Sequence, residues 1–97
     1  MINDDFKEDS TGRVYRTDAR LTKDYTGMTH CVNKINGVVS GKKMLAEDRY
    51  TDEDRKKRVE DNVAHLKLLK AKTDWKGNED WSTIDKAITD GEAYLGG

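Results

Sequence analysis

The chain has 97 residues, of which 38% are charged and 34% hydrophobic, and its formal net charge is −1. This length predicts one domain, and the small apolar share predicts a small core. The near-neutral charge lacks the basic excess that phosphate binding requires, so nucleic acid is not an expected partner. The single cysteine excludes an internal disulfide framework and fits a reducing compartment. No apolar run approaches the roughly 20 residues of a membrane span, and no signal peptide is recognisable, so we expect an intracellular protein.

Residues 1–25 are predicted to form an extended N-terminal arm. Charges of both signs alternate through this stretch, and no helical stripe of apolar residues appears in it. A flexible tail is the alternative. Because the arm has too few apolar side chains to fold on itself, we expect the helical body or a neighbouring chain to hold it. Val14, Tyr15 and Leu21 are its predicted anchors on a partner.

Residues 27–46 are predicted to form the first helix, with Thr26 as the N-cap. Apolar side chains recur at the helical period on one face, which comprises Met28, Cys31, Val32, Ile35, Val38, Val39 and Leu45. Gly37 and Gly41 fall on the opposite face, where each costs about 1 kcal/mol relative to alanine.

Residues 52–72 are predicted to form the second helix, capped by Thr51 and followed by three acidic residues that suit the helix dipole. Two apolar stripes lie on nearly opposite sides of this helix. The first stripe comprises Val59, Val63, Leu66 and Leu69, and the second comprises Ala64, Leu68, Ala71 and Trp75. Because a helix with two apolar stripes needs two partners, the second stripe is predicted to contact another protein.

Residues 81–95 are predicted to form the third helix, capped by Asp80 or Ser82. Its apolar face comprises Trp81, Ile84, Ala87, Ile88, Gly91, Tyr94 and Leu95. The KGNE segment, residues 76–79, is predicted to be a short turn that makes the second and third helices antiparallel. The two tryptophans, which flank this turn, are expected to cover the mouth of the hairpin, or else to bind a partner. The chain is therefore predicted to be all-α, a three-helix domain at residues 26–97 that ends in a helical hairpin and carries the extended arm.

Motifs that would carry chemistry are incomplete in this sequence. Residues 37–43 have the wrong spacing for a phosphate loop. Residues 74–85 have Lys76 where a calcium loop needs its third-position oxygen ligand and Glu79 where it needs its sixth-position glycine. Cys31 and His65 form a conceivable nucleophile and base, but no orienting third group accompanies them. His30, Cys31 and His65 do not make a zinc site, because a fourth ligand and the repeated spacing of such sites are missing. We therefore predict no cofactor, no metal and no enzymatic activity.

The basic cluster at residues 55–58 is surrounded by acidic residues, and i,i+4 pairs such as Glu53 with Lys57 predict a solvated face that neutralises itself. Contact with nucleic acid through this cluster and through Arg13, Arg16 and Arg20 is the functional alternative. It would make the chain a small regulator that binds nucleic acid or inhibits a host protein.

The C-terminal half, from Arg58 to Leu95, resembles the helical-hairpin tails of small structural proteins of tailed bacteriophages. The residues that carry the resemblance are Asn62, His65, Leu66, Leu69, Trp81, Ile84, Ala87, Ile88 and Gly91. The resemblance covers under half of the chain, and it implies a virion component that decorates, cements or connects larger subunits. We therefore expect a non-enzymatic protein that docks into a larger protein assembly or a homo-oligomer.

Overall fold

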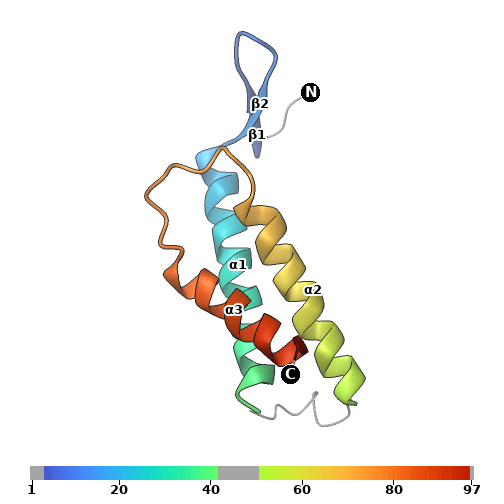
Figure 1. The fold of residues 1–97 in the computed structure, drawn as a ribbon. Helices are drawn as coiled ribbons and strands as arrows, with labels where there is room; N and C mark the ends of the chain where they lie inside the picture. Colours follow the sequence, from blue (N-terminus) through green and yellow to red (C-terminus); the bar gives the residue numbers. More distant parts are fainter. Residues whose placement is uncertain (1–3, 42–50, 97) are drawn as a thin grey trace.

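The computed structural model describes residues 4–41 and 51–96, and helices make up 67% of these residues (Figure 1). The elements in chain order are β1 (Phe6–Glu8), β2 (Val14–Arg16), α1 (Asp18–Val39), α2 (Asp52–Lys70) and α3 (Ser82–Gly96). The predicted three-helix fold is confirmed. The two short strands, which we did not predict, form an antiparallel hairpin that projects from one end of the helical body (Figure 1).

Helix α1 begins earlier than the sequence predicted. Thr17, and not Thr26, is its N-cap, and the Thr17 side chain accepts a hydrogen bond from the Arg20 backbone N–H. The arm is therefore shorter than residues 1–25, because its last third is helical. The helix also ends earlier than residue 46. Gly41 follows it with φ +72°, in the left-handed region that favours glycine, and donates its N–H to the Val38 carbonyl.

The three helices pack against one another around a single apolar core. Helix α1 runs away from the hairpin, α2 returns toward it, and α3 crosses both (Figure 1). The predicted apolar face of α1 is buried, except that Val39 is exposed and Leu45 lies outside the described residues. The largest fully buried side chains are Met28, Ile35, Val59, Leu66 and Ile84.

The start of α2 was predicted correctly. Thr51 accepts a hydrogen bond from the Asp54 N–H, and the Asp54 carboxylate accepts one from the Thr51 N–H, which completes a capping box. The first apolar stripe is buried in the core. Three members of the second stripe are exposed, namely Ala64, Leu68 at 66% and Ala71, whereas Trp75 is partly buried against the core.

Helix α3 approaches the other two helices closely at Gly91. A Cβ atom at this position would lie 2.7 Å from Val63 Cγ2, 3.2 Å from Val59 Cγ1 and 3.3 Å from Ile35 Cγ2. The absence of a side chain therefore allows α3 to pack onto both α1 and α2. Ile84 and Ala87 are buried on the same face, as predicted.

The hairpin is closed by the segment from Asp9 to Gly12. The Asp9 side chain accepts hydrogen bonds from the Thr11 and Arg13 backbone N–H groups, and Gly12 has φ +87°. A polar turn that ends in a left-handed glycine is a common way to join two strands. The register places Phe6 opposite Arg16 and Glu8 opposite Val14, so these four side chains share one face of the hairpin.

Candidate functional site

The connection between α2 and α3 is longer than the predicted turn. It runs over residues 71–81 and passes the first half of α1 before α3 begins (Figure 1). Gly77 has φ +94°, and the Glu79 carboxylate accepts hydrogen bonds from the backbone N–H groups of Lys76 and Gly77. The KGNE segment thus forms a local turn, as its residues indicate, but this turn is only part of the connection.

The two tryptophans pack against each other and against Tyr25 of α1. The ring centroids of Trp75 and Trp81 lie 5.1 Å apart in an edge-to-face arrangement, and Tyr25 lies 6.4 Å and 6.1 Å from them. Trp75 donates its Nε1–H to the Leu69 carbonyl at 2.9 Å, and Tyr25 donates its hydroxyl to the Asp80 carbonyl at 2.6 Å. The aromatic cluster covers one end of the core, as the interpretation of the tryptophans as a structural cap requires.

A charged network attaches the hairpin to the helical body beside this cluster. Arg16, at the end of β2, donates from Nη1 to Asp24 at 2.9 Å and from Nε to Asp74 at 3.0 Å. Its Nη2 also pairs with Asp74, and its backbone N–H donates to the same carboxylate at 3.0 Å. The guanidinium lies 4.3 Å from the ring centroid of Trp75. These contacts join three segments that are distant in the sequence.

The network is partly shielded from water, and this strengthens it. Only 5% of the Arg16 side chain, 10% of that of Asp24 and 17% of that of Asp74 is exposed. The hydrogen bonds from Arg16 lower the pKa of Asp74 to about 2, although burial opposes this change. A shift of this size from 3.8 corresponds to about 2 kcal/mol of stability at neutral pH.

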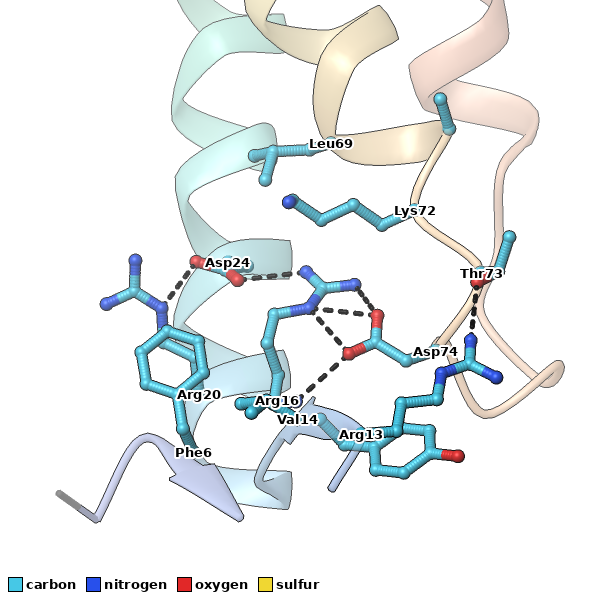
Figure 2. Close-up of a pocket in the computed structure, with 12 residues that line it drawn as sticks. Phe6, Arg13, Val14, Arg16, Arg20, Asp24, Leu69, Lys72, Thr73 and Asp74 are labelled. Atoms are coloured by element: carbon cyan, nitrogen blue, oxygen red, sulfur yellow. Dashed lines mark hydrogen bonds and ion pairs between the residues drawn. The ribbon is translucent and has the colours of Figure 1, made fainter. Parts of the chain in front are cut away.

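A cavity of about 420 Å³ lies where the hairpin, α1 and the end of α2 meet, and we call it the junction pocket (Figure 2). Figure 2 shows Arg16 at its centre, between Asp24 on one side and Asp74 on the other. Its apolar lining comes from Phe6, Val14, Tyr15, Leu69 and Ala71. Its remaining lining residues are Arg13, Arg16, Arg20, Asp24, Lys72, Thr73 and Asp74.

The predicted partner-binding residues fall into three groups. Val14, Tyr15 and Ala71 line the junction pocket, although we assigned the first two to the arm and Ala71 to the second stripe of the second helix. Ala64 and Leu68 are exposed on α2 and do not line that pocket. Leu21 is only 6% exposed and Trp75 is half-buried, so this chain already covers most of both side chains.

The residues considered for chemistry are not brought together into a site. Cys31 is buried in the core, and this burial raises the pKa of its thiol, while His65 is exposed on α2. Over residues 4–41 and 51–96, no group of three or more histidine, cysteine or acidic side chains is arranged to hold a metal ion. None of the helices in this part of the chain has the length and apolar character needed to cross a bilayer.

The basic residues named for nucleic-acid binding are largely paired with carboxylates. Arg16 is engaged by two aspartates, and Arg20 pairs with Asp5 and Asp24. In the cluster at residues 55–58, Arg55 pairs with Asp52 at 3.2 Å and Lys57 with Asp61 at 3.6 Å. Two members of the cluster are thus neutralised by acidic neighbours, but Lys57 pairs with Asp61, whereas the prediction named Glu53 as its partner.

Sequence reasoning missed the charged network, although one signal for it was present. Leu21, Asp24, Met28, Cys31 and Ile35 follow the alternating three- and four-residue spacing of a buried helix face. Asp24 therefore occupies a core position, which is unusual for a carboxylate unless it is paired. Because we began the helix at residue 27, this position was not recognised.

Comparisons of the chain with protein-family models, with curated proteins and with solved structures found no match. The resemblance to phage structural proteins therefore remains a prediction.

Proposed function

We propose that this protein is a non-enzymatic module that docks onto other protein subunits in a larger assembly. One observation carries the proposal: the β1–β2 hairpin lies at one end of the helical body (Figure 1) and its apolar side chains remain uncovered. Val14 is 54% exposed and Phe6 is 39% exposed, on the hairpin face that also carries the buried Arg16.

The attachment of the hairpin matters for binding because ordering a loop at an interface costs free energy. A two-stranded hairpin of this size is marginally stable when isolated. Here Arg16 ties β2 to α1 and to the connection before α3, so much of the ordering has occurred before a partner arrives. A preorganised, partly apolar projection is suited to contact another protein surface.

The exposed stripe of α2 supports the same proposal through a second surface. Ala64 and Leu68 face solvent on a helix whose opposite side is buried in the core. A module with contacts at its hairpin end and along α2 could bridge two neighbouring subunits. A decoration, cement or connector protein of a tailed-phage virion is the specific form that the sequence resemblance suggests.

Site-specific photocrosslinking in the cell that makes the protein tests the proposal. A photoreactive residue is placed at Val14, and a control is placed at Glu60, which is exposed on α2. We expect a discrete protein adduct from position 14, with the partner identified by mass spectrometry and its binding reproduced with purified components. The same adduct should be absent from position 60. Equal, diffuse labelling from both positions would contradict docking through the hairpin.

A further inference from the structure

The junction pocket contains more positive charge than its carboxylates neutralise. Four cationic residues and two aspartates line it, and both aspartates are engaged by Arg16. Arg13 contacts the Thr73 hydroxyl and the Tyr15 ring but no carboxylate among the described residues. The Lys72 side chain has no ion-pair or hydrogen-bond partner within residues 4–41 and 51–96.

Lys72 is placed where it can meet an incoming group. Figure 2 shows its side chain extending from the start of the connection after α2 across the pocket toward α1, above the guanidinium of Arg16. Asp24 and Asp74 are the carboxylates that line this pocket, and the hydrogen bonds and ion pairs of Arg16 already occupy them. The ammonium group of Lys72 is therefore available for an external carboxylate.

Apolar surface lies beside this free charge. Phe6 and Val14 share one face of the hairpin, and both line the pocket while remaining substantially exposed. An apolar side chain that entered here would lose contact with water on several sides, which favours binding by about 25 cal/mol per Å² buried. The pocket thus combines an apolar wall with an unpaired cation.

We infer that the junction pocket binds an acidic segment of a partner protein, whose carboxylate pairs with Lys72 and whose neighbouring apolar side chain packs between Phe6 and Val14. The inference rests on the proposed docking function and adds the chemistry of the partner. Charge complementarity with Lys72 requires a negatively charged ligand, and the apolar wall favours a protein segment over a bare anion.

A phosphate group fits this pocket less well than a carboxylate. Phosphate sites gather several donors, often with bidentate arginines, around a group that carries nearly two negative charges. Here the guanidinium of Arg16 is already engaged by Asp24 and Asp74, so it offers no bidentate pair to a phosphate. A carboxylate carries one negative charge, so pairing with Lys72 alone is enough to neutralise it.

A selection from a display library of random peptides about 12 residues long, with the full-length protein as the target, tests the inference. We expect enrichment of peptides in which aspartate or glutamate adjoins a large apolar residue. Selection of basic or uncharged peptides would overturn the inference, and so would the absence of any selected peptide. The crosslink from position 14 would still report on docking in either case, so the two proposals can fail separately.

The affinity of one selected peptide for charge variants then locates the contact. Lys72→Glu should weaken binding about tenfold, measured by fluorescence anisotropy of the labelled peptide, because an attraction becomes a repulsion. A peptide with its acidic residue changed to lysine should recover affinity for Lys72→Glu, which a merely structural role of Lys72 would not produce. Lys56→Glu, an equal charge change at the far end of α2, should leave affinity unchanged.

Competition experiments separate the other occupants. Displacement of the peptide by inorganic phosphate or by a random single-stranded oligonucleotide at equal concentration would overturn the inference in favour of an anion site. Sedimentation that shows self-association abolished by Lys72→Glu would overturn it in favour of a second copy of this chain. The inference is supported if neither phosphate nor the oligonucleotide displaces the peptide, if Lys72→Glu abolishes no self-association, and if the lysine peptide recovers affinity for Lys72→Glu.

Discussion

The helical body and the hairpin junction are held together by opposite kinds of interaction. Twelve apolar side chains are buried among the described residues, and the apolar core that joins the helices contains no charged side chain. The two buried charged residues of this part of the chain, Arg16 and Asp24, both lie at the junction. Apolar burial is non-directional and tolerates small shifts, whereas a guanidinium that binds two carboxylates requires one geometry.

This difference explains why a weak hairpin can be positioned at all. Its strands have three residues each, and its exposed apolar side chains add little burial. A charged network contributes modestly to stability because desolvation opposes the attraction, but it specifies orientation. The body therefore supplies most of the stability of the fold, and the junction determines where the hairpin points.

The largest expected effect is on the body. Leu66→Ala removes a fully buried side chain and should lower the free energy of unfolding by about 3 kcal/mol, since it leaves a cavity in the core. Leu68→Ala, two residues along the same helix, should change it by less than about 0.5 kcal/mol because Leu68 is 66% exposed. Urea denaturation followed by tryptophan fluorescence measures both values, and similar losses would contradict the assignment of the two stripes.

The next effect is on the junction. Asp74→Asn should lower the free energy of unfolding by about 2 kcal/mol at pH 7, and amide hydrogen exchange should accelerate in residues 6–16. The folded-state pKa of Asp74, about 2, lies below its unfolded value, so its contribution is present above about pH 4 and is lost as the pH falls toward 2.

The difference between the wild type and Asp74→Asn should therefore shrink on acidification from about pH 5 to about pH 2. Asp61→Asn is the matched control, because the Asp61 side chain is 61% exposed and its pair with Lys57 lies on the surface. A gap between wild type and Asp74→Asn that is independent of pH would show that the Asp74 charge does not hold the hairpin.

A smaller effect sharpens the account of helix packing. Gly91→Ala should destabilise the fold by about 1 to 2 kcal/mol, because the new Cβ would overlap Val63. The same substitution at Gly37, where a Cβ would have no neighbour within 4 Å, should stabilise it by about 0.5 kcal/mol. Thermal denaturation measures the change in stability of each variant. A change of the same sign for Gly91→Ala and Gly37→Ala would refute the close approach of α3.

The smallest effect concerns the aromatic cluster between the two regions. Trp75→Phe keeps an aromatic ring beside Trp81 but removes the part-buried hydrogen bond from Nε1 to the Leu69 carbonyl, and the loss of this bond alone should cost about 1 kcal/mol. Trp75→His tests whether a ring N–H donor restores part of the loss. Equal denaturation midpoints for the wild type and Trp75→Phe would show that this bond adds nothing to stability.

Local patterns in the sequence were enough to predict the helices and their buried faces. Thr51 with its acidic first turn predicted the start of α2, and the periodic apolar residues of α2 and α3 predicted which sides enter the core. These predictions succeeded because caps and hydrophobic periodicity act over one or two turns of helix. The start of α1 was missed because its first two turns, from Asp18, are mostly charged and polar and show no long apolar stripe.

The position of the hairpin and the composition of the junction pocket depend instead on contacts between distant segments. Arg16 and Asp74 are 58 residues apart in sequence, and no local pattern indicates that they are partners. Their pairing depends on the path of the connection at residues 71–81, which the aromatic cluster and its hydrogen bonds place against α1. Only the folded chain therefore brings Val14, Tyr15 and Ala71 to one pocket, because no short-range rule links a strand near the N-terminus to the end of α2.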